Sequence, residues 1–404
     1  MCCSMRKLFN LLLMVAALFS CQRPLFDTPA REGTGSGGRV PPPSPPDTAR
    51  YTRSVYSTAI VFPDSVNWRK GQTQGARLVL FKDTAPLRML DAGNQPQPDR
   101  HTFQEGHLWT QFTDGFKTTI ACDGTVFFDY PGEEAPLGFL VAGGEVHTLG
   151  QHPGGGFTYR INGQEVFSSP QGMVLSWSAN PDWEGGALSR DGTGVYYSYA
   201  LPVKDEESEI WEYRVMKGGE IRKMIPAVTG SELHDIRVMD GVVYRLEYRY
   251  GRLCFIRDED LTPLTLPDGA HGMRLTPVDG TMGIKGFHEE NRNIHSWIRD
   301  ADSLLYHHSM LYRHQGDIFA REKEQAVVIL DGEDCVVLAI RDTVSVSLPN
   351  ESYRLHTPRC VQHRKGTLAL ALTGDTEHEE NLLVVNDRKH SMSFNGYFTG
   401  IYIE

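Results

Sequence analysis

The feature that most constrains the fold is the even spacing of short polar turns, each flanked by segments rich in β-branched and aromatic residues. Eight such turns follow one another at intervals of 39 to 47 residues. They lie near Asp83, Gly124, Gly163, Glu207, Gly251, Glu290, Gly332 and Glu379. A repeat of about 43 residues is typical of propeller blades, in which each unit buries its apolar face only against its neighbours.

A second series of turns runs out of step with the first. Its members are Asp114-Gly115, Asp191-Gly192, Asp240-Gly241, Asp279-Gly280 and, in the equivalent place, Lys365-Gly366. Asp-Gly is the strongest short-range signal for a hairpin. Further turns precede residues 220–225 and 261–266, so four strands are expected in each repeat. No stretch keeps the spacing of an amphipathic helix over three turns, and the expected fold class is all-β.

One repeat can be written out in full. Residues 188–197 read Leu-Ser-Arg-Asp-Gly-Thr-Gly-Val-Tyr-Tyr, and Glu209-Ile210-Trp211 and Gly218-Gly219-Glu220 follow. This order resembles the repeat of TolB-type propellers, with Arg190 in place of the usual Pro and Glu209 in place of the usual Asp. The resemblance covers one repeat and implies the fold. It implies no active site, because the fold hosts many functions.

The number of repeats predicts a propeller of eight four-stranded blades, with seven as the alternative. The region 51–106 is the least regular; it is expected to form the first blade, and the alternative is that its strands complete the last one. We expect the last strand, residues 400–404, to pair with residues near 59–62 and close the ring, because an open ring would expose strand edges.

The first twenty residues indicate export. Arg6 and Lys7 precede an apolar run, residues 8–19, which is shorter than the roughly 20 residues that span a bilayer, as in a secretory signal. Residues 18–21, Leu-Phe-Ser-Cys, resemble the lipobox of bacterial lipoproteins. The resemblance implies cleavage before Cys21 and lipidation of its thiol. The alternative is an ordinary signal peptide in which Cys21 is a leftover thiol.

The residues that follow Cys21 indicate where in the cell envelope the protein is located. Gln22 is not Asp, which by the same resemblance implies the outer membrane, and no acidic run follows to imply surface display. The protein is therefore expected to face the periplasm. Residues 28–50 are rich in Gly, Pro, Ser and Thr and cannot bury enough apolar surface to fold. The predicted organisation is a signal peptide (1–20), a lipidated tether (21–50) and a propeller domain (51–404).

The net charge limits the classes of partner that the protein can bind, and the cysteine spacing limits its covalent and metal chemistry. The formal net charge is −11 and no basic patch stands out, which argues against nucleic acid, where Lys and Arg supply most of the affinity. Cys122, Cys254, Cys335 and Cys360 are widely and unevenly separated. Four cysteines could pair in an oxidising compartment, but their spacing fits neither a disulfide framework nor a zinc site, and buried free thiols are expected.

The sequence contains no recognisable catalytic motif. Residues 288–291 and 378–381 share the sequence His-Glu-Glu-Asn, and both are predicted to be solvated hairpin loops with no metal. The glycine run 154–156 lacks the Lys and Ser/Thr of a phosphate loop. Trp177 and Trp183, beside Asp182 and Glu184, could stack on a sugar or pack between blades.

Five Asp-Ser/Thr-aliphatic tripeptides resemble the O-glycosylation acceptor of Bacteroidota secreted proteins. The residues that would carry the glycan are Thr48, Ser65, Thr84, Ser303 and Thr343. The alternative is turn chemistry, since Asp, Ser and Thr favour turns.

Two functions remain open. The first is a monomeric, non-enzymatic lipoprotein, bound to the membrane by its lipid, whose propeller binds a protein or glycan without a cofactor. The second is a propeller-type polysaccharide lyase or glycosidase, with carboxylates and histidines that converge from several blades. Convergence of ionisable groups favours the enzyme, whereas a face of loops and aromatic rings favours binding.

Overall fold

The chain divides into two compact units, 1–50 and 51–404, and all the residues that the computed structural model describes lie in the second. These are residues 53–91, 100–113, 116–175, 186–204, 209–226, 228, 230–278, 281–290, 293–311, 326–331, 334–339, 353–354, 356–364, 367–374, 380–386 and 388–404. Among them, no helix is both long and apolar enough to cross a membrane.

Antiparallel sheets account for nearly all of the regular structure. The first sheet has the order β3-β2-β1-β32, with β1 Val55–Val61, β2 Arg77–Lys82, β3 Ala85–Asp91 and β32 Gly396–Ile403. The second contains β4 Arg100–Gln104, β5 His107–Thr113, β6 Lys117–Cys122 and β7 Thr125–Pro131. The third contains β8 Ala135–Ala142, β9 Glu145–Gln151, β10 Phe157–Ile161 and β11 Gln164–Ser169.

The middle of the chain repeats this pattern. The fourth sheet contains β12 Met173–Val174, β13 Ser189–Asp191, β14 Gly194–Lys204, β15 Glu209–Lys217 and β16 Glu220–Ile225. The fifth contains β17 Ser231–Met239, β18 Val242–Arg249, β19 Arg252–Arg257 and β20 Asp260–Pro263. The sixth contains β21 His271–Val278, β22 Thr281–Glu290, β23 Asn293–Arg299 and β24 Leu304–Leu311.

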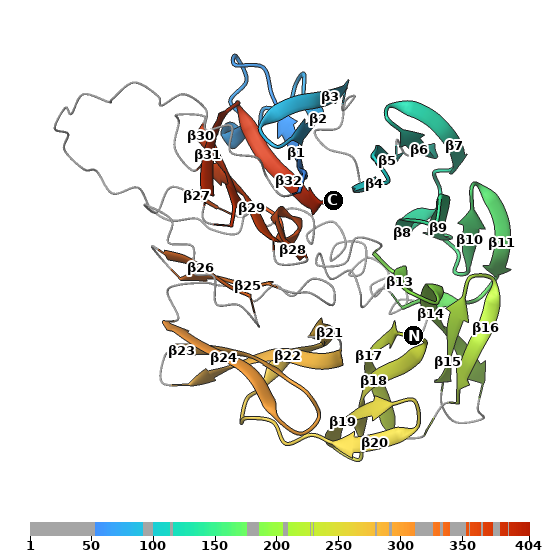
Figure 1. Cartoon of the computed structure of the whole chain (residues 1–404). Helices are drawn as coiled ribbons and strands as arrows, with labels where there is room; N and C mark the ends of the chain where they lie inside the picture. Colours follow the sequence, from blue (N-terminus) through green and yellow to red (C-terminus); the bar gives the residue numbers. More distant parts are fainter. Residues whose placement is uncertain are drawn as a thin grey trace. The chain divides into compact units, whose positions relative to one another are not determined.

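Two more sheets follow. One pairs β25 Ala326–Asp331 with β26 Asp334–Ala339. The other contains β27 Tyr353–Arg354, β28 Val361–Arg364, β29 Thr367–Gly374, β30 Glu380–Val385 and β31 Arg388–Ser393. The short 3-10 helices η1 and η3 span Trp68–Lys70 and Pro358–Cys360. Figure 1 shows the sheets following one another in chain order, from blue to red. The fold is an all-β propeller of four-stranded antiparallel sheets, as predicted.

The first sheet joins the two ends of the propeller unit. Its inner strand β32 pairs with β1 from Val55 opposite Ile403 to Val61 opposite Gly396, and Figure 1 shows the red strand beside the blue one. The predicted pairing is confirmed, but β32 begins at Gly396 instead of residue 400. Ala59 therefore faces Phe398, whereas Gly400 faces Thr58.

A side-chain repeat underlies the turn between the third and fourth strands. In five sheets an Asp or Asn at this turn has a φ of 50° to 55°, and its Oδ1 accepts a hydrogen bond from a backbone N–H near the start of the second strand. The donor and acceptor pairs are Val55 and Asp83, Leu108 and Asp123, Val146 and Asn162, Val243 and Asp258, and Leu368 and Asn386. All five donors are buried aliphatic residues. Asp and Asn suit the site because they tolerate the left-handed region.

The first turn series mixes two kinds of turn, which corrects the predicted phase. Asp83, Gly124 and Gly163 lie between third and fourth strands, whereas Gly251 and the end of β22 at Glu290 lie between second and third strands. The connection between Val174 and Ser189 is long. Its length compensates for the switch from one kind of turn to the other, so the spacing between the turns of the series stays even. The other positions of the series, near residues 207, 332 and 379, lie outside the described residues.

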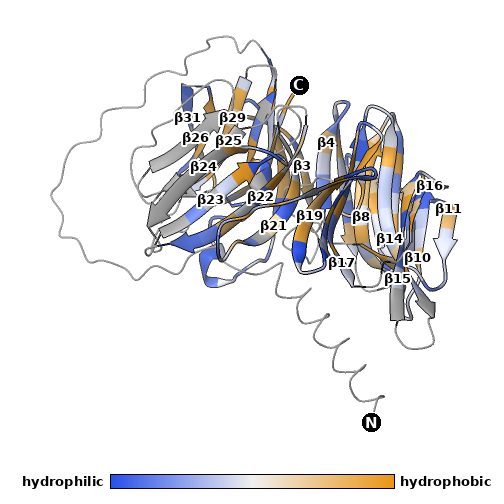
Figure 2. Ribbon diagram, turned by 90° about the horizontal axis from the view of Figure 1, so that it is seen from below, coloured by the Kyte–Doolittle hydropathy of each residue, from blue (hydrophilic) through white to orange (hydrophobic). Residues whose placement is uncertain are grey.

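The apolar core lies between neighbouring sheets, as a propeller requires. One cluster joins β1 and β2 to β29, β30 and β32, around Phe398 and Leu370, and another joins β8, β9 and β10 to β14, around Tyr159 and Tyr199. Figure 2 shows apolar residues in orange along the strands of the propeller unit. Adjacent blades therefore hold one another by burial of apolar surface.

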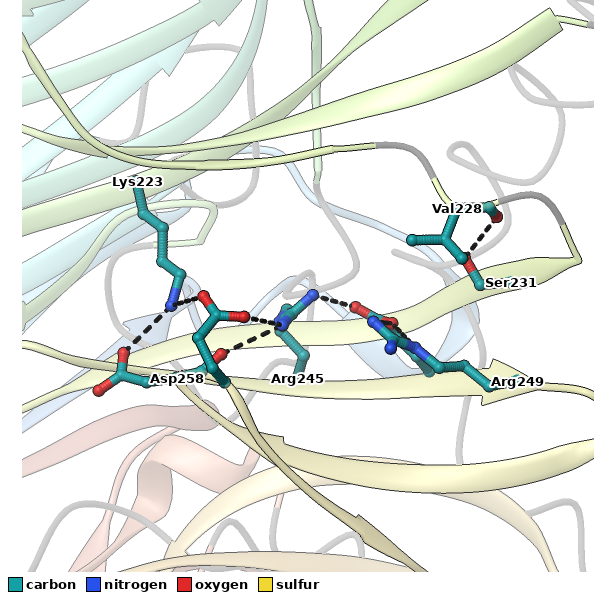
Figure 3. Close-up of polar contacts among 8 residues, drawn as sticks. Lys223, Val228, Ser231, Arg245, Arg249 and Asp258 are labelled. Atoms are coloured by element: carbon teal, nitrogen blue, oxygen red, sulfur yellow. Dashed lines mark hydrogen bonds and ion pairs between the residues drawn. The ribbon is translucent and has the colours of Figure 1, made fainter.

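Ion pairs also join the fourth and fifth sheets, as Figure 3 shows. Lys223 on β16 lies 2.8 Å from Glu259 and 3.4 Å from Asp258, in the turn between β19 and β20. On β18, Arg245 pairs with Glu247, and Glu247 also pairs with Arg249 at 2.7 Å. The pairs that Lys223 forms lie near the surface, where each contributes little, so they supplement the apolar contacts. Arg245 and Glu247 are buried and pair within β18 itself.

Candidate functional site

Several of the residues singled out in the sequence lie outside the described part of the chain. These are Cys21, Thr48, Trp177, Asp182, Trp183, Glu184, Thr343, His378 and Glu379. Cys335 lies in β26. Glu380 and Asn381 begin β30, and Asn381 is buried there, which corrects the prediction of a solvated loop for residues 378–381. Three of the proposed glycosylation positions, Ser65, Thr84 and Ser303, are described and all three are exposed. Cys122, Cys254 and Cys360 are free thiols, and the last two are buried.

A cavity of about 280 Å³ opens where the inner strands run into their second strands. Its lining comes from four sheets and consists of Tyr56, Phe103, Gln104, Glu105, Gly106, Arg190, Gln362, Arg364, Tyr402, Ile403 and Glu404. Segments far apart in the sequence therefore contribute to one concave surface. Ligand sites in proteins are concave surfaces of this kind, in which apolar walls surround a few polar groups.

Three aromatic rings form one wall. The rings of Tyr56 and Phe103 stack with centroids 4.2 Å apart, and the ring of Tyr402 lies 6.1 Å from that of Phe103. Tyr56 and Tyr402 face each other across β1 and β32, while Phe103 comes from β4 of the next sheet. The wall is thus built by the strand pairing that closes the ring.

Backbone contacts hold the polar side chains of the cavity. Nη1 of Arg190 donates a hydrogen bond to the carbonyl oxygen of Val141 at 3.1 Å, and Nη1 of Arg364 donates to that of Ile403 at 2.9 Å. Oε1 of Gln362 accepts a hydrogen bond from the N–H of Ile403. Neither guanidinium forms an ion pair within the described residues, and each has five N–H donors in all. Both can therefore bind further acceptors.

Two carboxylates accompany the arginines. Glu105 and Gly106 form the turn between β4 and β5, where both have positive φ, 54° and 81°. The Tyr56 hydroxyl donates to Oε2 of Glu404 at 3.1 Å. The side-chain charges of the lining therefore balance, with two guanidiniums and two carboxylates.

A buried polar network lies one step further along the same strands. Nε2 of His101 lies 3.0 Å from the Thr58 hydroxyl and 3.1 Å from the Thr399 hydroxyl, and Thr399 donates to Thr58. Burial, with a smaller contribution from the Arg359 charge, lowers the pKa of His101 to about 3. The neutral imidazole therefore connects β4 to both strands of the closing pair.

Sequence reasoning did not find this cavity, because its residues are spread over residues 56–404 and share no motif. One signal was visible. Arg190 is the position at which the chain departs from the TolB-type repeat, where proline is usual, and the structure places Arg190 in the cavity.

Two clusters in the described residues have side chains that could hold a metal. His107, Cys122 and Asp123 form one, and His288, Glu290 and His295 form the other. Residues 288–291 were predicted to form a solvated loop. Glu289 and Glu290 are exposed, but His288 is buried at the end of β22. His295 was missed, because it meets His288 across the hairpin.

Comparison with known proteins supports the fold. No family model and no curated protein matches the sequence. Among solved structures, the dihydro-heme d1 dehydrogenase NirN in complex with DHE is similar over 89% of this chain and 77% of its own, at 12% identity with a TM-score of 0.50. Apo AztD from Citrobacter koseri matches 87% of this chain and 98% of its own, at 12% identity and a TM-score of 0.48.

The β-propeller domain of the Trilobed protease from Pyrococcus furiosus matches 73% of this chain and 94% of its own, at 10% identity and a TM-score of 0.41. At these identities the likeness concerns the fold alone, because one fold hosts many activities.

Proposed function

We propose that this protein is a lipoprotein of the cell envelope whose propeller binds a partner in the cavity at the closing strand. The observation that carries the proposal is the cavity itself, with three aromatic rings and two arginines that backbone carbonyls hold in place. Tyr and Arg are the residues that supply most binding energy at protein interfaces. A protein segment is therefore the first partner, and a glycan is the alternative.

Catalysis receives less support from the lining. None of the described residues that line the cavity is Ser, Cys, His or Lys, so the cavity lacks the nucleophile and base of a hydrolase triad. A glycosidase is the second candidate, because Glu105 and Glu404 both line the cavity and a pair of carboxylates can cleave a glycosidic bond.

The membrane address belongs to the same proposal. Cys21 would carry the lipid, residues 28–50 would hold the propeller away from the bilayer, and the propeller would act as a monomer in the periplasm. Replacement of Cys21 by Ala tests this step, since the variant should lose its partition with outer membranes. Continued sedimentation with that fraction would contradict lipid anchoring and would leave binding in the cavity unaffected.

Site-directed photo-crosslinking tests the binding. A photo-crosslinking derivative of phenylalanine replaces Gln104 in the cavity or, as the control, Met89, which is exposed on the outermost strand β3. Irradiated cells should give a discrete adduct from position 104 and none from position 89. The adduct should weaken when Arg190 and Arg364 are replaced by Ala.

The nature of the adduct separates the partners. A protein adduct identifies the first candidate, and a protease-resistant adduct identifies a glycan. Equal adducts at both positions would contradict the proposal. Release of reducing sugars from envelope polysaccharide that is lost in Glu105→Gln or Glu404→Gln would establish the glycosidase instead.

A further inference from the structure

Strand register brings three metal-ligating side chains to one face of the hairpin formed by β22 and β23. His288 lies directly opposite His295, and Glu290 lies opposite Asn293. Because successive side chains of a strand point to opposite faces, His288 and Glu290 share a face and Glu289 points to the other. Directly opposed residues also share a face, so His295 joins His288 and Glu290.

The three groups are close enough for one ion. The imidazole rings of His288 and His295 lie nearly parallel, at 14°, with centroids 4.9 Å apart. Nε2 of His288 lies 4.0 Å from Oε2 of Glu290. One ligand atom from each of the three residues lies within 4.8 Å of the other two.

Ligation requires only a small movement. Ligand atoms around a tetrahedral zinc ion, with bonds of about 2.0–2.1 Å, are about 3.3 Å apart. The Glu290 side chain is 62% exposed and the His288 side chain 11%. The exposed carboxylate can therefore rotate toward an imidazole that the hairpin already holds.

We propose that His288, Glu290 and His295 bind one divalent transition-metal ion, with Zn²⁺ as the ion expected. Two imidazoles and a carboxylate suit Zn²⁺, Ni²⁺ or Cu²⁺, whereas Ca²⁺ and Mg²⁺ prefer sets made of oxygen alone. Three protein ligands leave a fourth position for water or for a group of a bound partner. The site lies on the sixth sheet, away from the residues that line the cavity.

The other cluster is a poorer site. Nη1 of Arg88 lies 2.6 Å from Oδ2 of Asp123, and this carboxylate also accepts hydrogen bonds from His107 and from the N–H of Leu108. Burial and the Asp123 charge raise the pKa of the Cys122 thiol, which must lose its proton to bind a metal. The Arg88 guanidinium therefore already occupies the position beside Asp123 that a metal cation would need.

Calorimetric titration of ZnCl₂ into the chelator-treated full chain, purified in detergent without a histidine tag, tests the proposal. The test variants are His295→Gln and Glu290→Gln, because both side chains are more exposed than His288 and their loss spares the fold. The controls are Glu289→Gln, on the opposite face of the same hairpin, and His271→Gln, which is opposite Phe287 on the same sheet.

We expect the wild-type chain to bind one Zn²⁺ whose dissociation constant rises at least tenfold in both test variants and less than twofold in both controls. Zinc should also raise the melting temperature of the wild type and not that of the test variants, since a ligand of the native state stabilises it. Unchanged affinity in His295→Gln and Glu290→Gln would overturn the proposal. So would an equal loss in the controls, or binding that only His107→Gln removes.

Discussion

The carboxylate of Asp191 accepts a hydrogen bond from the backbone N–H of Gly241 at 2.9 Å, although the two residues are 50 positions apart in the sequence. Each belongs to an Asp-Gly turn between the first and second strands of its sheet, so the contact ties the fourth sheet to the fifth. The other carboxylate oxygen of Asp191 accepts from the hydroxyl and the N–H of Thr193. One side chain thus fixes its own turn and the next.

Replacement of Asp191 by Ala should lower the free energy of unfolding by about 1–2 kcal/mol, since hydrogen bonds to a charged group are lost. Burial opposes ionisation of Asp191, but the hydrogen bonds from Thr193, Gly241 and Gly194 outweigh it and lower its pKa. The stabilisation should therefore be complete above pH 4 and disappear as the pH falls further. Urea unfolding at pH 7 and pH 3 measures both effects, and an equal difference between wild type and variant at the two pH values would contradict the assignment.

His101 should make the fold sensitive to mild acid. Its pKa is lowered by burial, and by the Arg359 charge, to about 3, compared with about 6.5 in an unfolded chain. Because the native state binds the proton less well, stability is complete above pH 6.5 and falls by about 1.4 kcal/mol per pH unit below it.

Urea unfolding of wild type and His101→Gln at pH 7.5 and pH 5.5 measures this contribution. The wild type should lose about 1.4 kcal/mol more than the variant between the two pH values. His271→Gln is the control, because His271 is exposed, and it should behave like the wild type. The same acid sensitivity in wild type and His101→Gln would exclude His101 as its source.

The Asp/Asn turn repeat predicts a graded response at Asn162. Its Oδ1 accepts a hydrogen bond from the N–H of Val146 at 2.9 Å, and its φ is 50°. Asn162→Gly should cost about 1 kcal/mol, the net value of one hydrogen bond. Asn162→Ala should cost about 1–2 kcal/mol more, because alanine is strained in the left-handed region.

The fourth sheet offers a natural comparison for that series. Gly218 occupies the equivalent place with a φ of 56°, and its N–H bonds to the carbonyl oxygen of Val195. In thermal unfolding, the melting temperature should be highest for the wild type, lower for Asn162→Gly and lowest for Asn162→Ala. A glycine variant less stable than the alanine variant would show that backbone strain does not govern the site.

Gly396 should tolerate no side chain. A Cβ there would clash with the carbonyl oxygen of Ile60, which belongs to the backbone of the paired strand β1. Gly396→Ala should therefore disturb the closing pair and lower the unfolding free energy by about 2 kcal/mol or more, as overpacked sites do. Gly192→Ala is the control, since a Cβ at Gly192 meets nothing within 4 Å. Equal stability of the two variants would contradict the close approach.

The sequence was informative where local signals act alone. The strands at 194–204, 209–217 and 220–225 begin or end at the turns predicted at Gly192 and Gly218, because hairpin turns are set by a few neighbouring residues. The phase of the first turn series was wrong, since an Asp or Gly turn does not reveal which two strands it joins. The number of blades and the lipid on Cys21 stay predictions.

The candidate sites depend on contacts that no local pattern records. Arg190 and Arg364 meet at one cavity because separate sheets place them there. His288 and His295 are seven positions apart, and only the register of the hairpin makes them neighbours. A histidine on each side of a predicted turn is a signal that register analysis could have used.

The pairing of β1 with β32 has a consequence for the synthesis and folding of the chain. The partner of β1, the first strand of the propeller, is synthesised some 340 residues later. Contacts so distant in sequence form slowly. Until then the edge of β1 has no partner strand on one side. The pair of β1 and β32 therefore cannot form before synthesis of the chain is complete. Passage through a membrane in the unfolded state would not require this pair to be broken.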